Sequence, residues 1–279
     1  MQIIDGRKIQ KEILARIREE VAQLSFVPIF CDVLVGTDLA SVQYVEMKKK
    51  TALSLGIEFH SANFPVSITT EELVKEIEKL NQTLNMCGII IQLPLPSHID
   101  KRVALDAIDP DLDVDFLGTK AGMDFYNGKS KRGLPTALAC MKCLESVDLD
   151  LKDKNIVVLG QGLLVGKPVS ASLEMRGFKT INIDRNTENK EVLIKNADVI
   201  ISGIGKGKYI TGDMLKEGVV VIDAGTSEID SGIVGDVDFE SVKEVASFIS
   251  PVPGGVGPVT VAMLLENVLE VAKKLQNNK

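Results

Sequence analysis

The sequence predicts an α/β fold with two domains, each built on a parallel sheet. Three observations predict it. Nearly continuous apolar runs of strand length alternate with amphipathic segments of helical period, which is typical of parallel sheets covered on both faces. A chain of 279 residues is long enough for two domains of roughly 150 residues. A glycine-rich turn follows one of the later strands and precedes a helix, which is the strand–turn–helix order of a Rossmann-like domain in the second half of the chain.

The first half of the chain shows this alternation from its beginning. Residues 7–24 carry apolar side chains every three or four positions with charges between them, as in an amphipathic helix. The elements expected after it are a strand at 28–36, a helix at 40–55, a strand at 57–66, a helix at 70–84 and a strand at 87–92.

The second half repeats the pattern as a Rossmann-like, doubly wound parallel sheet. Its expected elements are strands at 155–160, 180–184, 199–202 and 219–223 and helices at 167–176 and 259–275. We place the seam near residues 133–136. The predicted domains are therefore 1–135, with the segment 259–279 packing back onto it, and 136–258.

Composition excludes several classes of protein. A net charge of −7 argues against non-specific nucleic-acid binding, which needs clustered Lys and Arg. No apolar run reaches the length of a membrane helix, and the first residues do not resemble a signal peptide. Four cysteines in so long a chain predict no disulfide framework, so a reducing cytoplasm is expected.

Few residues suggest a metal site, and we predict none. Cys140 and Cys143 form a C-x-x-C pair inside an apparent helix, with no second pair or neighbouring histidine, so we expect buried apolar thiols. The acidic run 109–115 lacks the regularly spaced oxygen ligands and the glycine of a loop metal site. His60 and His98 have no motif around them.

The glycine-rich turn is the first candidate site. Gly160, Gln161, Gly162 and Gly166 lie between an apolar strand and a helix. Glycines allow backbone N–H groups to approach a pyrophosphate, and the helix N-terminus adds positive potential. The third glycine comes one residue later than in the usual fingerprint, so a tight turn without a ligand is the alternative.

The second candidate is a pair on the helix at 40–55. Tyr44 and Lys48 are four residues apart and so share a helix face, where a phenol and an ammonium could enter one cleft. A desolvated lysine can take part in proton transfer. The alternative is that the lysine run 48–50 is a solvated face, and spacing alone favours this.

Two further segments stand out. Gln92 ends an apolar strand just before two prolines, where open α/β sheets bind ligands, although a plain strand terminator fits equally well. Residues 251–258 place three glycines between prolines, which predicts a stiff functional loop more than an interdomain linker.

Taken together, these segments resemble the bifunctional methylenetetrahydrofolate dehydrogenase/cyclohydrolase family over nearly the whole chain. The resemblance is carried by residues 4–6, by 35–41 leading into Tyr44 and Lys48, by 88–96, by 197–202, 221–225 and 235–237, and most specifically by 251–258 with Thr260. It reverses the preference for a solvated Lys48.

The resemblance implies a substrate and roles. The substrate would be 5,10-methylenetetrahydrofolate, bound between the domains. Tyr44 would position the folate ring. Lys48 would assist hydride transfer and then hydrolysis of the methenyl product to 10-formyltetrahydrofolate, and Gln92 would tune Lys48. Asp115 would read the donor edge of the pterin, which suits an acceptor-only carboxylate. We also predict that Pro253, Gly254 and Gly255 contact the substrate.

The cofactor is expected to be NADP on family grounds, with NAD as the alternative. It would lie on the turn from Gly160 to Gly166, with Thr226 as a further contact. Asp184, 24 residues after Gly160, stands near the position where a carboxylate accepts from the ribose of NAD. Arg185 beside it could bind a 2′-phosphate instead.

The chain departs from the family pattern at three places. The usual Lys-Asp-Val-Asp-Gly run reads Leu-Asp-Val-Asp-Phe at 112–116, and Pro-Cys-Thr-Pro is replaced by Leu-Pro-Thr-Ala at 134–137. Gly-Arg-Ser in the nucleotide turn reads Gly-Gln-Gly at 160–162, which removes an arginine expected at a 2′-phosphate.

The sequence leaves two alternative functions. Another two-domain nicotinamide dehydrogenase would explain the second domain but not the Tyr44–Lys48 helix or the 251–258 loop. A non-catalytic folate- or dinucleotide-binding protein would not need Lys48. The resemblance further implies tetrahydrofolate derivatives as partners, a homodimer, and a place in one-carbon metabolism and purine biosynthesis.

Overall fold

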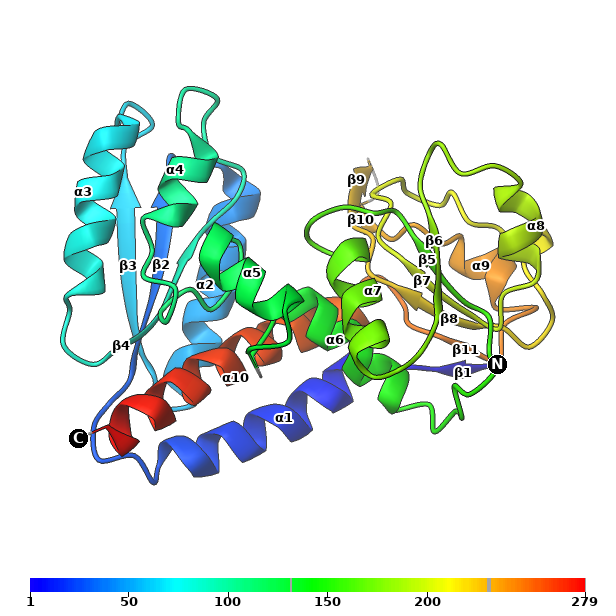
Figure 1. Cartoon of the computed structure of the whole chain (residues 1–279), viewed down its shortest axis with the longest axis horizontal. Helices are drawn as coiled ribbons and strands as arrows, with labels where there is room; N and C mark the ends of the chain where they lie inside the picture. The colour runs from blue at the N-terminus through cyan, green and yellow to red at the C-terminus, as the bar shows by residue number, and fades with distance from the viewer. Residues whose placement is uncertain (131, 230–231, 279) are drawn as a thin grey trace. The chain divides into compact units, whose positions relative to one another are not determined.

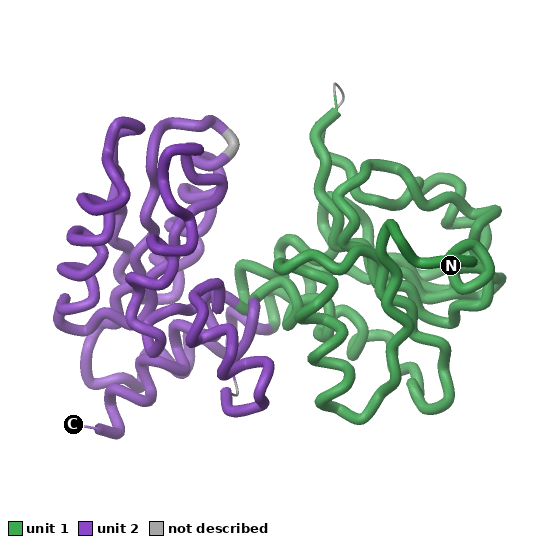
Figure 2. Tube along the Cα trace, turned by 45° about the horizontal axis from the view of Figure 1, so that its top comes forward, with its two compact units in different colours: residues 1–12, 135–263 green, residues 13–134, 264–279 purple. Residues whose placement is uncertain are grey.

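A computed structural model describes residues 1–130, 132–229 and 232–278. The chain forms two compact units: Met1–Glu12 with Pro135–Met263, and Ile13–Leu134 with Leu264–Lys279, of which Lys279 lies outside the described residues. Figure 1 labels the elements and Figure 2 colours the two units. The helices α1 (Gly6–Val21) and α10 (Val256–Asn277) each contribute residues to both units.

The unit of residues 13–134 and 264–279 contains a three-stranded parallel sheet in the order β3-β2-β4. Its elements are β2 (Ile29–Val35), α2 (Leu39–Ser54), β3 (Glu58–Phe64), α3 (Thr70–Asn81), β4 (Met86–Ile91), α4 (Lys101–Asp106) and α5 (Thr119–Tyr126). The central strand β2 is buried along almost its whole length, as expected for a parallel sheet covered on both faces.

The unit of residues 1–12 and 135–263 contains a six-stranded parallel sheet in the order β1-β11-β8-β7-β5-β6. Its strands are β1 (Gln2–Ile3), β5 (Ile156–Leu159), β6 (Thr180–Ile183), β7 (Val199–Ser202), β8 (Val220–Asp223) and β11 (Phe248–Ile249). Strands β6 and β7 lie on opposite sides of β5, so the chain reverses its winding direction there. Open α/β sheets bind ligands at this switch point, beyond the carboxyl ends of the strands.

Helices and a hairpin complete that unit. They are α6 (Pro135–Glu145), α7 (Gly166–Met175), α8 (Lys190–Lys195), the 3-10 turn η1 (Gly212–Met214), α9 (Phe239–Val242) and the antiparallel pair β9 (Ser227–Ile229) and β10 (Gly232–Val234). Fully buried Val157, Ile200 and Val221 from three neighbouring strands form the centre of its core. The predicted α/β class with parallel sheets is confirmed.

The first twelve residues belong to this unit because β1 pairs in parallel with β11. A two-residue strand carries no periodic signal of its own, so the sequence did not separate it from the helix that follows. The pairing gives the six-stranded sheet its edge strand β1.

Candidate active site

Lys48 is buried in the unit that holds the three-stranded sheet. Helix α2 begins after Asp38, whose carboxylate accepts from the Ser41 backbone N–H at 2.9 Å. One helical turn separates Tyr44 and Lys48, and the Lys48 Nζ lies 4.7 Å from the centre of the Tyr44 ring. Only 1% of Lys48 is exposed, whereas Lys50 is in solvent. Lys48 is therefore not part of a solvated charge run.

Two acceptors from neighbouring strands meet the Lys48 ammonium. The Gln92 Oε1, just after β4, accepts from Nζ at 2.7 Å, and the Asp32 Oδ2, inside β2, forms an ion pair with Nζ at 2.6 Å. The Gln92 side-chain amide donates to the Leu93 carbonyl at 3.0 Å, so its oxygen is turned toward the lysine. Burial raises the pKa of Asp32, and the Lys48 cation opposes that rise.

The sequence analysis does not predict a role for Asp32, which lies in an expected apolar strand. A carboxylate in the middle of such an apolar run is the feature that distinguishes this position. Buried charges need a partner, and a carboxylate in a central strand indicates a cation beside it.

Tyr44 and Asp115 share the electrostatic surroundings of Lys48. Although 36% of Tyr44 is exposed, desolvation of its phenol by the surrounding protein, with the nearby carboxylates of Asp115 and Asp32, raises the pKa of Tyr44 to about 12, so the phenol stays protonated at neutral pH. Burial and the charge of Asp113 raise the pKa of Asp115 to about 7, against the opposing influence of Lys48. The site thus groups an ammonium, a phenol, an amide and a carboxyl that titrates near neutrality.

Asp113 shapes the loop that presents Asp115. Its carboxylate accepts from the backbone N–H groups of Asp115, Phe116 and Gly118 at 3.1, 2.8 and 2.8 Å. The Asn267 side chain on α10 donates to the Val114 carbonyl at 2.9 Å and so holds the same loop. The acidic run is therefore organised around one structural carboxylate, which leaves Asp115 as its candidate ligand contact.

Phe116 occupies a backbone conformation that favours glycine. Its φ is +60°, and its ring is buried, 6.4 Å from the ring of Phe125 and 5.2 Å from the guanidinium of Arg132. The aromatic packing offsets the strain of a left-handed residue, which costs about 1–2 kcal/mol. The apolar ring also adds to the burial around the preceding Asp115.

In the other unit, the glycine turn brings backbone segments into close approach. Gly160 has φ +82°, and a Cβ there would lie 2.7 Å from the Gly203 carbonyl oxygen at the end of β7. A Cβ on Gly166 would lie 1.6 Å from the Gly160 carbonyl oxygen, whereas Gly162 faces open space. No side chain caps the N-terminus of α7. A turn of this shape, at the switch point of the sheet, fits a dinucleotide phosphate.

Gln161 does not extend from this turn. Its amide nitrogen lies 3.3 Å from the Val158 carbonyl oxygen and 3.5 Å from the Asn182 Oδ1. The side chain thus folds back along the sheet, where Ser170 also donates to Asn182 at 2.6 Å.

Asp184 and Arg185 follow β6. The Asp184 Oδ1 accepts from the Asn186 backbone N–H at 2.8 Å and from the Thr187 hydroxyl at 3.1 Å, and these contacts lower the pKa of Asp184. The carboxylate is therefore ionised and already shapes a local turn. Arg185 is exposed beside it.

Two buried aspartates that sequence reasoning did not single out as site residues shape the loops after β7 and β8. Asp223 accepts from the backbone N–H groups of Gly225, Asp236 and Val237 at 2.9–3.1 Å. Asp236 in turn accepts from the Ser202 hydroxyl at 2.7 Å. Burial raises the pKa of Asp223 to about 6. These bonds place the exposed Thr226 at the carboxyl edge of the sheet.

The 251–258 loop is held tightly at its base. Ser250 accepts from the Asp223 backbone N–H at 2.7 Å, and Gly255 donates to the Pro251 carbonyl at 2.7 Å. Gly254 has φ +112°, and a Cβ on Gly6 would lie 1.7 Å from the Gly255 carbonyl oxygen. Pro253 is exposed at the tip. The glycines here serve close backbone packing in the dinucleotide-type unit.

The two cysteines of the C-x-x-C pair belong neither to the residues around Lys48 nor to the glycine turn. Cys140 and Cys143 are buried in α6, and burial raises the pKa of the Cys143 thiol to about 12. Within residues 1–130, 132–229 and 232–278, no group of three or more His, Cys, Asp or Glu side chains could hold a metal ion. Nor does any helix in this part of the chain have the length and apolar character to cross a membrane.

Known proteins match this arrangement over the full chain. Residues 4–115 match the catalytic domain of the tetrahydrofolate dehydrogenase/cyclohydrolase family, and residues 135–276 match its NAD(P)-binding domain. The bifunctional protein FolD of Nautilia profundicola is 42% identical, with 98% of each chain covered.

Solved structures of proteins from this family have the same fold as this chain. The bifunctional methylenetetrahydrofolate dehydrogenase/cyclohydrolase FolD of Campylobacter jejuni superposes with a TM-score of 0.95 at 36% identity, covering 99% of both chains. The Trypanosoma brucei enzyme, solved with NADP and an inhibitor, gives 0.92 at 34% identity over 98% of this chain and 97% of that one. The chain therefore belongs to the tetrahydrofolate dehydrogenase/cyclohydrolase family.

Proposed function

We propose that the protein oxidises 5,10-methylenetetrahydrofolate to the 5,10-methenyl form with NADP and then hydrolyses that product to 10-formyltetrahydrofolate. The observation that carries the proposal is the buried Lys48 ammonium, bonded to Gln92 and Asp32 and covered by the Tyr44 ring. The full-length match to bifunctional FolD proteins supports both activities and favours neither another small-acid dehydrogenase nor a non-catalytic binder.

One cluster can serve both steps. Hydride loss leaves a cationic methenyl carbon, and water adds to that same carbon. Lys48 would orient the substrate and move a proton at its Nζ, while Gln92 and Asp32 hold that nitrogen in place. Tyr44 would pack against the folate ring. Asp115 would accept from the pterin, and Pro253, Gly254 and Gly255 are the further proposed substrate contacts.

A bound dinucleotide would supply the hydride acceptor. Gly162 faces open space in which a pyrophosphate would lie, while Gly160 and Gly166 allow the close backbone contacts that shape the turn. The N-terminus of α7, which has no side-chain cap, would turn its positive end toward that phosphate. Gln161 lines the turn, and Thr226 is exposed where β8 ends.

NADP is the proposed cofactor, with NAD as the alternative. The T. brucei relative holds NADP, which supports the choice. The Asp184 carboxylate already accepts from its own turn, which reduces its capacity to bind a ribose hydroxyl. Arg185 is exposed beside it and can reach a phosphate through its guanidinium. We further propose a homodimer in the cytoplasm, contributing to purine biosynthesis.

Lys48→Met tests the catalytic assignment. It should lower the hydrolysis rate at least about a hundredfold, the usual contribution of a positioned acid–base group, while the affinity for the dinucleotide stays unchanged. Hydrolysis of methenyltetrahydrofolate is followed by absorbance, and circular dichroism checks the fold. More than about a tenth of the wild-type hydrolysis rate in a folded variant would remove Lys48 from the mechanism.

Arg185→Ala tests the cofactor assignment. Losing a guanidinium that binds the 2′-phosphate should raise the KM for NADP about tenfold or more and leave the KM for NAD nearly unchanged. Initial rates with each dinucleotide measure this, with Lys190→Ala, at the first residue of α8, as the control. Equal changes for both cofactors would exclude the contact.

A further inference from the structure

Asp32 is an unusual residue for its place in the fold. It lies inside β2, the central strand of its sheet, and is fully buried among apolar neighbours on the strand. A charged side chain is costly at such a position unless it is paired. Replacing a buried ion pair by apolar residues is often neutral or even stabilising. Stability alone therefore gives no reason for a carboxylate here.

The ion pair with Lys48 is the contact that Asp32 makes through its side chain. Its Oδ2 lies 2.6 Å from the Lys48 Nζ, and neither of its carboxylate oxygens has a hydrogen-bond partner of regular geometry in the described part of the chain. Asp113 provides the contrast in the same unit, because three backbone N–H groups hold its carboxylate. Asp32 thus does not shape the backbone as Asp113 does.

The two acceptors together define where the Lys48 nitrogen points. Asp32 approaches from β2 and Gln92 from the end of β4, two adjacent strands of one sheet. An ammonium has three N–H donors. One is donated to Gln92, while the ion pair with Asp32 holds the nitrogen from a second side. The ammonium therefore keeps N–H donors for a bound substrate.

We propose that Asp32 is the positioning residue for Lys48, holding its Nζ in place and aimed at the substrate. The inference rests on the proposed function, in which Lys48 is the reacting group. It adds a specific source for the orientation of that group.

The other groups that face the ammonium do not replace Asp32. Gln92 is neutral, and the Tyr44 phenol on α2 stays protonated. Asp115 acts on Lys48 through its charge, with Asp113 behind it, but titrates near neutrality. On the strand, the Cys31 thiol adjoins Asp32 and is un-ionised because burial raises its pKa to about 12. Asp32 is thus the closest negative charge to Lys48 in the described residues.

Asp32→Asn is the test, because it keeps the shape and removes the charge. Without the carboxylate, Gln92 is the remaining acceptor that holds the Lys48 Nζ. The kcat for hydrolysis should therefore fall about tenfold or more, while the KM for methenyltetrahydrofolate changes little. The ¹³C resonance of the labelled Lys48 side chain, assigned by its absence in Lys48→Met, should also move, and this is measured without any turnover.

Two variants separate positioning from stability. Phe30→Leu, two residues earlier on β2, removes buried packing without touching a charge. It should lower the melting temperature and leave the kcat for hydrolysis and the Lys48 resonance unchanged. Asp32→Glu keeps the charge and should recover the wild-type kcat at least in part. Should Asp32→Asn fail to fold, Asp32→Val, which suits a buried strand, takes its place in both measurements.

The outcomes are distinct. A Lys48 resonance and a kcat unchanged by Asp32→Asn, with only a lower melting temperature as in Phe30→Leu, would overturn the proposal. A wild-type protein that does not hydrolyse methenyltetrahydrofolate would contradict the proposed function. The Lys48 resonance would still decide whether Asp32 positions Lys48.

Discussion

Three aspartates in one unit show how surroundings decide the role of a residue. Asp113 is held by backbone N–H groups, Asp32 by a single lysine, and Asp115 by neither. The first shapes a loop, the second faces the Lys48 ammonium, and the third is left to titrate. The same side chain therefore performs three tasks, because burial and hydrogen-bond partners differ.

Asp115 predicts a pH dependence of stability. Its pKa of about 7 in the folded protein exceeds the ordinary value, so the folded state binds a proton more tightly than the unfolded chain does. Its contribution is most favourable below about pH 4 and is lost as the pH rises to 7, at up to about 1.4 kcal/mol per pKa unit. Asp115→Asn should therefore raise the melting temperature, relative to wild type, more at about pH 8 than at about pH 5.

Thermal melts of the substrate-free proteins at the two pH values check this. Since an ionised carboxylate would accept from the pterin, Asp115→Asn and Asp115→Ala should also weaken folate binding while dinucleotide binding stays constant. The same offset in melting temperature at both pH values would show that the carboxyl does not titrate as described.

At the residue scale, the sequence predicts the pairing of Lys48 with Tyr44 but not the burial of Lys48. Its pairing with Tyr44 follows from helical spacing, but its burial depends on Asp32 and Gln92, which come from two strands far away in sequence. Spacing alone favoured a solvated lysine run. Only the resemblance to a family pointed to Lys48, and the local sign of Asp32 was a carboxylate inside an apolar run, which does not say what it pairs with.

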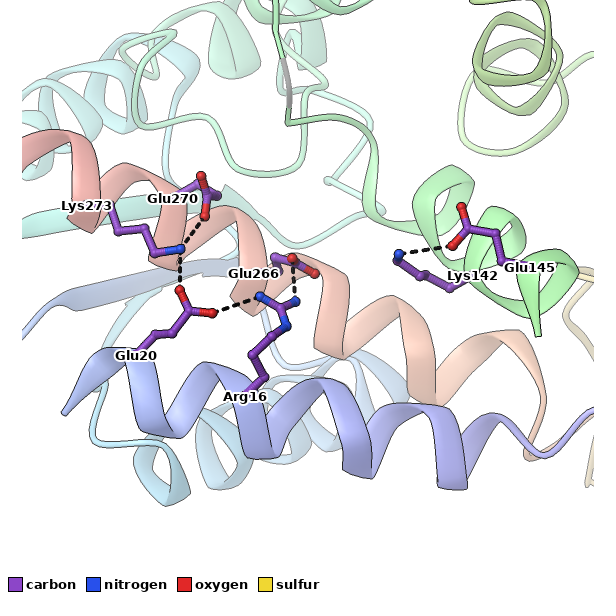
Figure 3. A network of polar contacts seen from close by, with 7 residues as sticks. All are labelled: Arg16, Glu20, Lys142, Glu145, Glu266, Glu270 and Lys273. Atoms are coloured by element: carbon purple, nitrogen blue, oxygen red, sulfur yellow. Dashed lines mark hydrogen bonds and ion pairs between the residues drawn. The ribbon is translucent and has the colours of Figure 1, made fainter. Parts of the chain in front are cut away.

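At the scale of elements, charged side chains join α1 and α10, while an apolar side chain of α1 is buried nearby in the sequence. Figure 3 shows Arg16 of α1 bonded to Glu20 at 3.0 Å and to Glu266 of α10 at 2.6 Å, while Lys273 pairs with Glu20 and Glu270. Beside this network, Ile17 is fully buried. The two kinds of contact should differ greatly in their effect on stability.

Ile17→Ala should lower the free energy of unfolding by roughly 2–5 kcal/mol, because it leaves a cavity in a packed core. Arg16→Ala should cost only about 0–1 kcal/mol, since the Arg16 side chain is 45% exposed and water screens its pairs. Urea denaturation of both variants gives the comparison, and added salt should shrink the Arg16 effect further. A larger loss from Arg16→Ala would mean that the charged network dominates this packing.

Elements differ in how far the sequence predicts them. The helix at residues 70–81 combines a full capping box with an apolar face, and the strand at 199–202 is a continuous apolar run, so both are visible locally. The short strands β1 and β11 and the helices α8 and α9 are two to six residues long. Pieces this short form only through the tertiary pairing that surrounds them, so no periodicity predicts them.

At the scale of the whole molecule, the candidate site residues are distributed over two parallel-sheet units. The lysine cluster belongs to the unit of residues 13–134 and 264–279, and the glycine turn belongs to the unit of residues 1–12 and 135–263. The α/β class followed from the alternation of apolar strands and amphipathic helices. The position of the amino-terminal strand did not, because it depends on pairing with β11 near the other end of the chain.

The central claim is that one Lys48-centred site carries out both oxidation and hydrolysis. The most direct measurement supplies 5,10-methylenetetrahydrofolate with NADP, and in parallel with NAD, to wild type and to Lys48→Met, and follows reduced nicotinamide and 10-formyltetrahydrofolate in the same reaction. Wild type should form both products, faster with NADP, and Lys48→Met should lose formation of the formyl product. A folded wild-type protein that forms no reduced nicotinamide with either dinucleotide, or a Lys48→Met variant that forms both products at the wild-type rate, would contradict the account.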